Sequence, residues 1–255
     1  MMKIYSLGSG SKGNCMVVTN GKNSILIDAG LSPRTTMTKL SQVGVLPHEL
    51  DAVLVTHEHS DHIRSIAEIA AVAPVYSHSE TLEAIGKTVR LPYKQTMEVD
   101  EKGFRLGSMD IQPFRVSHDA AYPLGFVIRD EDDSVCYMTD TGYISKGMMR
   151  MALGCNKVVL ESNHDKEMLI RGAYPEYLKR RILSDTGHLC NEESALTCGE
   201  LVKSGTKKIL LAHLSENNNL SELAYWTTRS YLEKCGAGKE VTIRVATQKD
   251  TVLLS

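Results

Sequence analysis

The first 28 residues of the chain form short segments, alternating or apolar, that predict a β-meander. Residues 2–7 and 23–28 alternate, and Cys15–Thr19 between them is an apolar run. Alternation with period two is typical of strands that bury one face, and the Gly- and Ser-rich residues 8–14 indicate a turn between the first two strands. We therefore expect the chain to open with consecutive antiparallel strands.

The next segments change between helical and strand periodicity. Pro33 begins a predicted helix that runs to about Val43, with Ser32 as its N-cap. Residues 51–56 are almost continuously apolar, as expected of a buried strand. Residues 61–72 follow with the apolar spacing of a helix, so strand, loop and helix are predicted in that order.

The remaining pattern predicts two rounds of strands followed by helices. Strands are predicted at residues 74–76, 103–116 (a hairpin), 124–129, 134–139, 157–161, 208–212, 240–246 and 251–254, and helices at 79–86, 175–183, 192–204 and 220–235. Because no linker or low-complexity tract interrupts this order, we expect one domain over residues 1–255. The pattern favours an α/β protein in which two sheets pack face to face with helices outside, an αββα sandwich.

Composition narrows the class of protein. Apolar residues make up 42% of the chain and the net charge is −2, which excludes a uniformly basic nucleic-acid-binding surface but leaves room for a local basic patch. The six cysteines form no CxxC pair, so we expect reduced and mostly buried thiols. No apolar run suits a signal peptide or a membrane span, and we expect a cytoplasmic protein that does not associate with membranes.

One nine-residue segment concentrates groups that bind metals. His57, His59, Asp61 and His62 fall within six residues where a predicted buried strand ends. His57 and His59 are two positions apart, so an extended backbone projects them to the same side, whereas the last two begin a helix and point from another direction. One segment can thus serve two neighbouring ions. Imidazole and carboxylate ligands suit zinc, manganese or iron, and a catalytic site keeps one position open for water.

This segment matches HxHxDH, the signature of the metallo-β-lactamase superfamily, and the chain resembles that superfamily. The resemblance implies that the remaining ligands lie at later strand ends, where His118, Asp140 and His213 occur. It implies two divalent ions, the first held by His57, His59 and His118 and the second by Asp61, His62 and His213, with Asp140 as the bridge.

Two N-terminal segments are candidate supports of this site. Asp28 matches a superfamily aspartate that supports the ligands without binding metal, and a turn-starting Asp is an equally good interpretation. Residues 8–14 offer consecutive backbone N–H groups that suit a phosphate, and a plain hairpin turn explains them as well. The candidates for lining the site are Ser9, Ser11 and Asn14.

A two-metal site of this kind is suited to hydrolysis. Two cations about 3.5–4 Å apart lower the pKa of a bridging water, so that hydroxide exists at neutral pH, and they also clamp the electrophile. Asp61 could take a proton or orient this water as well as bind metal. Because the same site serves lactamases, thioesterases, phosphodiesterases and nucleases, the fold alone does not choose among them.

Further polar groups follow the predicted strand at 157–161. Extra imidazoles and carboxylates beside two metals are candidate acids for protonating a leaving group, and Glu161, His164 and His188 are such groups. In the tRNase Z branch of the superfamily a Glu and a later His act in this way, and Glu161 and His188 come in the same order. Structural or surface histidines are the alternative. A basic run lies between His164 and His188, and it is either a solvated helix face or a phosphate-binding surface: Lys179, Arg180 and Arg181.

A closer resemblance extends almost from end to end. Segments 6–15, 26–30, 161–165, 187–191 and 212–218 are similar to the YycJ/WalJ family of bacterial metal-dependent exonucleases. This resemblance implies a compact protein without a β-CASP insertion, which degrades DNA from the 5′ end. The chain departs from the family at Cys190, where Ser is usual, and this change puts the hydrogen bonding of that position in doubt.

The sequence therefore favours a two-metal phosphodiesterase that acts on nucleic acid, a 5′-to-3′ DNA exonuclease using a metal-bridging hydroxide. Alternatives are a small-molecule phosphodiesterase or thioesterase on the same site, and RNA processing of the tRNase Z type. A regulatory protein with structural metals is disfavoured, because that role does not need seven ligands. The choice between DNA and RNA, exo- and endonucleolytic cleavage, the identity of the metal (zinc or manganese, with iron also suited) and the oligomeric state stay open.

Overall fold

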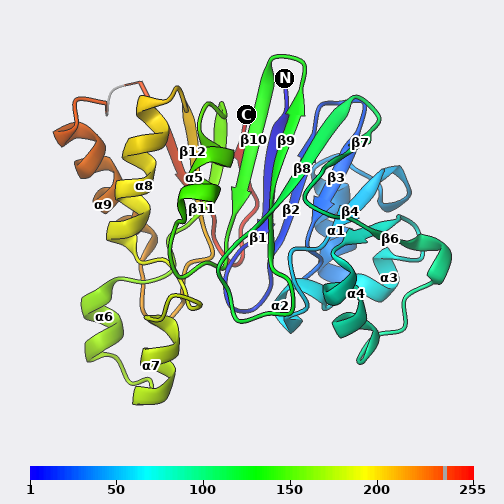
Figure 1. The fold of residues 1–255 in the computed structure, drawn as a ribbon, viewed down its shortest axis with the longest axis horizontal. Helices are drawn as coiled ribbons and strands as arrows, with labels where there is room; N and C mark the ends of the chain where they lie inside the picture. Colours follow the sequence, from blue (N-terminus) through cyan, green and yellow to red (C-terminus); the bar gives the residue numbers. More distant parts are fainter. Residues whose placement is uncertain (238–239) are drawn as a thin grey trace.

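Two seven-stranded sheets form the centre of the computed structural model, which describes residues 1–237 and 240–255 (Figure 1). The first sheet contains, in spatial order, β14 (Val252–Leu254), β1 (Lys3–Gly8), β2 (Cys15–Thr19), β3 (Ser24–Ile27), β4 (Ala52–Leu54), β5 (Val75–Ser77) and β6 (Thr96–Glu98). The second contains β13 (Thr242–Val245), β12 (Lys208–Ala212), β11 (Lys157–Glu161), β10 (Asp133–Met138), β9 (Leu124–Asp130), β8 (Met109–Arg115) and β7 (Phe104–Leu106).

Helices cover the outer face of each sheet. On the first sheet lie α1 (Pro33–Gln42), α2 (Ser60–Ile63), α3 (Ile66–Ile69) and α4 (Ser79–Gly86), and on the second α5 (Lys146–Ala152), α8 (Asn191–Lys203) and α9 (Ser221–Lys234). Two further helices, α6 (Lys166–Arg171) and α7 (Glu176–Ile182), extend beyond the ends of the strands (Figure 1). The layers are those of the predicted αββα sandwich, which the structure confirms.

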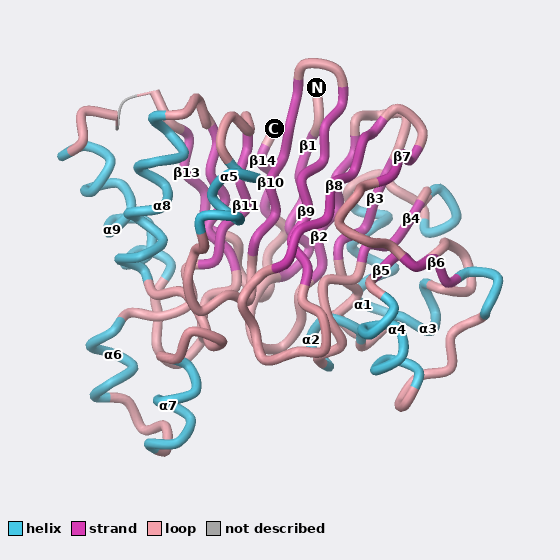
Figure 2. The backbone as a smooth tube through the Cα atoms, in the orientation of Figure 1, coloured by secondary structure: helices cyan, strands magenta, loops and turns pink. Residues whose placement is uncertain are grey.

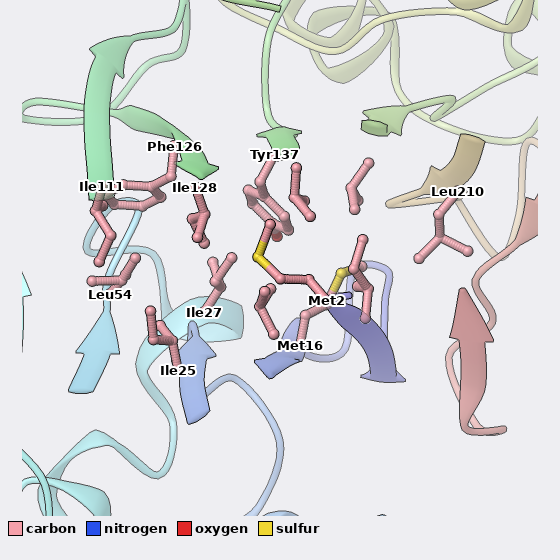
Figure 3. Packing of buried hydrophobic residues seen from close by; sticks show 14 of the residues in the cluster. Met2, Met16, Ile25, Ile27, Leu54, Ile111, Phe126, Ile128, Tyr137 and Leu210 are labelled. Carbon is pink, nitrogen blue, oxygen red and sulfur yellow. The ribbon is translucent and has the colours of Figure 1, made fainter. Parts of the chain in front are cut away.

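Three apolar clusters hold these layers together. Side chains of both sheets meet in the central cluster, where Met16 and Ile27 of the first sheet face Phe126 and Tyr137 of the second (Figure 3). Neighbouring residues on the same strands, such as Val17 on β2, point outward and pack under the helices. Because the strands at the centre bury both faces, apolar residues occupy consecutive positions rather than every second one.

Strand direction brings particular loops to one edge of the sandwich. Strands β3 and β4 are parallel neighbours in the first sheet, and β10, β11 and β12 are parallel neighbours in the second. Strand β8 is antiparallel to β9, which is antiparallel to β10, so β8 runs in the same direction as β10. The carboxyl ends of these strands open into the loops at the lower edge of Figure 2, beside α2 and α7. Ligands in α/β proteins commonly bind at such an edge.

Most predicted elements are confirmed, and the predicted helix over 61–72 is wrong because it breaks between α2 and α3. Ser65 leaves helical geometry with φ −110° and ψ 17°, and its N–H and its hydroxyl both donate to the carbonyl of Ala29, at 2.8 and 3.0 Å. The neighbouring chain thus takes hydrogen bonds that a continuous helix would use internally. Helices α5 and α6 and strand β6 were not predicted, nor were short 3₁₀ turns at Pro47–Glu49 and Tyr93–Gln95.

Other expectations also meet the structure. Ser32 caps α1 and accepts from the N–H of Thr35, as predicted. Five of the six cysteines are buried, and Cys235 is exposed. Within the described ranges, we find no helix with the length and apolar character needed to cross a membrane.

Candidate metal centre

Three histidines from two sheets form the first group of potential ligands. The chain leaving β4 carries His57 and His59, whose Nε2 and Nδ1 atoms lie 3.0 Å apart. His118, in the loop after β8, brings a ring nitrogen within 4.8 Å of both. Nitrogens this close, each offering a lone pair, are arranged to share a cation.

A second group lies beside the first. Asp61 Oδ2 lies 3.5 Å from His62 Nε2 and 3.8 Å from His213 Nε2, and His213 follows β12. Asp140, after β10, reaches both groups, because its Oδ2 is 3.5 Å from His62 Nε2 and its Oδ1 is 3.9 Å from His118 Nε2. The structure thus brings together all seven side chains that the superfamily resemblance indicates, with the Asp140 carboxylate between the two groups.

Hydrogen bonds on the outer side of the rings orient them. Nδ1 of His62 donates to Asp28 Oδ2 at 2.8 Å, and Nδ1 of His213 donates to Glu161 Oε1 at 2.8 Å. Nδ1 of His118 lies 3.1 Å from the carbonyl oxygen of Thr186. When an imidazole donates through Nδ1, its Nε2 keeps a free lone pair, so all three rings present Nε2 to the centre.

Two unpartnered atoms test whether metal ions suit this centre. Asp140 Oδ2 and His213 Nε2 are buried and lack a hydrogen-bond partner among the described residues. Burying such an atom without a partner costs about 1–3 kcal/mol, so native proteins rarely leave one unsatisfied. Both residues belong to groups of potential ligands that include His62, His213 with Asp61 and Asp140 with His57, and there the two atoms would coordinate a divalent cation. The side chains present therefore fit metal ions.

The backbone is strained at three positions of the centre. Asp28, Asp140 and His213 have φ of 59°, 56° and 55°, and they account for three of the four non-glycine residues with positive φ in the described ranges. This conformation costs an L-residue roughly 1–2 kcal/mol, and such strain concentrates at functional sites. Asp28 and His213 directly follow a strand and Asp140 lies two residues after one, so the left-handed turn aims each side chain across the strand ends. For Asp28, this favours the supporting role over a simple turn.

Close backbone packing fixes the position of Asp61. A Cβ on Gly30 would lie 1.6 Å from the carbonyl oxygen of Asp61, so only glycine fits there. The same carbonyl accepts from the N–H of Asn14 at 2.8 Å. The loop over residues 8–14 therefore holds the backbone of the metal-binding segment.

The electrostatics of the centre favour cations. Burial lowers the pKa of His213, but the carboxylates of Asp140, Asp61 and Glu161 outweigh this effect and raise its pKa to about 10. Burial raises the pKa of Asp61, and hydrogen bonds from His213 and His62 overcome it and hold that pKa far below its usual range. These carboxylates thus favour a positive charge at His213, which a divalent cation on Nε2 would supply in place of the proton.

Glu161 lies behind the cleft rather than in it. Its fully buried carboxylate accepts from Nδ1 of both His188 and His213 at 2.8 Å through Oε1, and from the N–H of Thr141 at 2.9 Å through Oε2. His188 lines the cleft, and with Nδ1 engaged only its Nε2 remains for a substrate. His164 is buried outside the cleft lining, and burial lowers its pKa to about 4.

The metal groups open into a cleft of about 230 Å³. Ser11 lines it, whereas Ser9 and Asn14 are buried and brace the ligands. Ser9 Oγ accepts from the N–H of His213 at 2.8 Å, and Asn14 Nδ2 lies 3.0 Å from His62 Nε2. The sequence did not indicate five lining residues, because they become neighbours only through the fold: Asn163, Tyr174, Leu178, Ile182 and Ser215.

The basic run divides in the structure. Lys179 points to α6, where its Nζ donates to the carbonyl of Ile170 at 2.7 Å, and Arg180 is exposed outside the cleft lining. Arg181 lines the cleft and donates through Nε and Nη2 to the two oxygens of Asp119, at 2.6 and 2.9 Å.

Known proteins are similar in sequence to most of the chain. Residues 23–214 match the model of the beta-lactamase superfamily domain. Exodeoxyribonuclease YycJ of Bacillus anthracis is 41% identical over 238 residues, covering 91% of this chain and 89% of that protein. Exodeoxyribonuclease WalJ of Streptococcus pneumoniae is 38% identical over 250 residues, covering 95% and 93%.

A solved structure has the same fold with little sequence identity. The metallo-beta-lactamase fold protein YhfI from Bacillus subtilis superposes with a TM-score of 0.75 at 18% identity, and the match covers 99% of each chain. At this identity the similarity carries the fold alone.

Proposed function

The chain belongs to the beta-lactamase superfamily and, within it, to the YycJ/WalJ family, and from this premise we propose that it is a metal-dependent exonuclease that degrades DNA from the 5′ end. The observation that carries the proposal is the cluster of seven ligand-type side chains, five of which line one cleft, in a chain whose relatives at 41% and 38% identity are named exodeoxyribonucleases. The geometry of the site thus supports hydrolysis, and the names of the relatives support DNA as the substrate class.

We propose two divalent ions, manganese or zinc, as the cofactors. His57, His59 and His118 would hold one, Asp61, His62 and His213 the other, and Asp140 would contact both. When bound, such ions lower the pKa of water to provide a nucleophile near neutral pH and neutralise charge on a phosphate.

The protein's own residues would position the attacking water and protonate the leaving oxygen. Asp61 lies at the edge of the cleft and can orient a water, since its side chain is 23% exposed. His188 faces the cleft through Nε2 and can donate a proton to the leaving oxygen, with Glu161 fixing its tautomer from behind. Arg181 supplies positive charge near the phosphate.

One degradation assay tests the proposal. Single- and double-stranded DNA and RNA, labelled at the 5′ or the 3′ end, are incubated with the protein and Mn²⁺, Zn²⁺ or a chelator. We expect release of label from the 5′ end of DNA, abolished by the chelator. Preferential cleavage of RNA would favour the tRNase Z type of processing, and hydrolysis of bis-(p-nitrophenyl) phosphate alone would favour a small-molecule phosphodiesterase. No hydrolysis of either by the metal-loaded protein would leave a regulatory role.

Asp61→Ala should abolish DNA degradation while the fold is kept, because it removes one ligand and the group that orients the water. Asp110→Ala is the matched control, since Asp110 is an exposed carboxylate on β8 far along the strand from the cleft. Measurement of kcat together with metal content checks this expectation. Activity of the Asp61 variant within tenfold of the wild type would contradict the two-metal mechanism.

A further inference from the structure

One face of α7 is turned toward the metal cleft. Leu178, Arg181 and Ile182 all line the cleft, and their spacing of three and four residues places them on one side of the helix. Tyr174, just before the helix, lines the same cleft. Arg180 does not line it, although it is adjacent in sequence. Helix α7 stands at the strand ends beside the loops that carry the metal ligands (Figure 1). We call these four lining residues the α7 face.

The guanidinium of Arg181, which supplies the positive charge of the α7 face, is fixed in orientation by hydrogen bonds. Arg181 is the one Lys or Arg among the described residues that line the cleft. Its fork is bonded to both oxygens of Asp119, the residue after His118. The hydrogen bond that the guanidinium donates to Asp119 raises the pKa of Arg181, and the negative charges of Asp61 and Asp140 raise it further. The same planar fork matches two oxygens of a phosphate.

The other part of the α7 face is aromatic and apolar. Nδ2 of Asn217 donates to the hydroxyl of Tyr174 at 2.9 Å, which anchors the tip of the ring to the loop after β12. Leu178 and Ile182 continue the wall toward Arg181. An anchored aromatic ring next to apolar side chains suits a nucleobase, because bases stack on aromatic rings regardless of their sequence.

We propose that the α7 face is the binding subsite for one nucleotide at the end of the substrate strand, with Arg181 on its phosphate and Tyr174 against its base. The inference rests on the proposed nucleic-acid substrate and specifies how the strand end is held. At about 230 Å³ the cleft is smaller than the usual range of roughly 300–1,000 Å³ for drug-sized ligands, so it suits one nucleotide rather than a stretch of duplex. Asp119 accepts the hydrogen bonds of Arg181 until the phosphate of the substrate replaces the carboxylate.

Binding of thymidine 5′-monophosphate tests the phosphate contact without depending on DNA cleavage. Calorimetry with the Mn²⁺-loaded protein compares the nucleotide with thymidine. Arg181→Ala should weaken nucleotide affinity about tenfold or more, as expected for a charge-assisted hydrogen bond, and leave thymidine affinity unchanged. Arg180→Ala, the adjacent exposed arginine, should change neither. Equal nucleotide affinity in the wild type and Arg181→Ala would overturn the subsite.

The base contact has its own test. Tyr174→Ala should reduce the preference for thymidine 5′-monophosphate over 2-deoxyribose 5-phosphate, which lacks the base. Tyr174→Phe keeps the ring and should retain most of that preference. An unchanged preference in Tyr174→Ala would overturn the base-binding role.

Competition by Asp119 is tested by a double-mutant cycle. Asp119→Asn should tighten binding of the nucleotide more in the wild-type background than in Arg181→Ala, because in the second background it only removes repulsion between a carboxylate and the phosphate and frees no guanidinium. Equal effects in both backgrounds would show that Asp119 acts through its neighbour His118 and would overturn the competition.

These results separate the inference from the proposed function. If the protein degrades DNA from the 5′ end and Arg181→Ala has an unchanged KM and nucleotide affinity, the subsite is wrong and the exonuclease stands. If nucleotide binding depends on Arg181 and Tyr174 but no nucleic acid is degraded, the subsite stands and the exonuclease proposal fails.

Discussion

A single buried carboxylate orients two imidazoles that face the cleft differently. Glu161 accepts from both His188 and His213 through the same oxygen, and both bonds are 2.8 Å long. The His213 side chain is 4% exposed and its Nε2 faces Asp61, whereas the His188 side chain is 13% exposed and lies in the cleft wall. Position therefore suits the first ring to a metal and the second to a substrate.

His188→Ala should keep the bound metal and lower kcat by about 10²–10⁴, the usual worth of general acid catalysis. The loss should be smaller with a p-nitrophenolate leaving group, which hardly needs a proton. His48→Ala, an exposed histidine in a 3₁₀ turn, is the control. Rates of DNA degradation and of bis-(p-nitrophenyl) phosphate hydrolysis measure the two effects. A wild-type rate on DNA would show that the proton comes from another group.

His164 should act on stability rather than on catalysis. Its ring is buried with both nitrogens unpartnered among the described residues, and burial lowers its pKa from 6.5 to about 4. The unfolded chain therefore binds more protons between pH 6.5 and 4, and stability is lost as the pH falls through this window, by on the order of 3 kcal/mol at most. In His164→Leu the free energy of unfolding should depend less on pH between pH 4 and 6.5, and kcat at pH 7.5 should be retained. A large loss of kcat would instead place His164 in the chemistry.

At the scale of elements, the sequence predicts strands and their ends better than the turns that aim the side chains. Asp140 and His213 come after strands that the apolar runs mark clearly, so the superfamily resemblance could indicate their place at the cleft. Their positive φ could not, because no local signal requires a left-handed turn at Asp or His. The break at Ser65 depends on Ala29, distant in sequence. Tyr174 lies in the turn between α6 and α7, and α6 was not predicted within this polar stretch.

Cys190→Ser should stabilise the start of α8. Cys190 is the N-cap of this helix, and its Sγ accepts from the N–H of Glu193 at 3.5 Å. A serine hydroxyl is a better N-cap acceptor than a thiol, so we expect a gain of about 0.5–1 kcal/mol. Thermal unfolding should show a rise of roughly 1–4 °C in Tm for a protein of this size. A fall in Tm would show that packing of the sulfur outweighs its weaker hydrogen bond.

At the scale of the whole molecule, the metal centre joins the two sheets. His57, His59, Asp61 and His62 follow β4 of the first sheet, whereas the remaining ligands follow strands of the second. The central apolar cluster packs the sheets over their length, but at this edge buried carboxylates face one another. Bound cations would offset that repulsion and connect the layers where apolar packing ends.

Removal of metal should therefore lower the stability of the entire sandwich and not only of one loop. A ligand that binds the folded state alone stabilises it by about 2.7 kcal/mol at a hundredfold excess over Kd, which corresponds to roughly 5–10 °C in Tm here. We expect Tm to rise with Mn²⁺ or Zn²⁺ concentration after chelation, with far-UV and near-UV circular dichroism reporting one shared transition.

Asp140→Ala should lose at least one ion by elemental analysis and much of this rise in Tm, because no shared carboxylate then separates the two cations. Asp110→Ala should show the full rise. A Tm that does not depend on metal would mean that the two sheets are held at this edge by their own side chains, and an unchanged rise in Asp140→Ala would place the bridging carboxylate elsewhere.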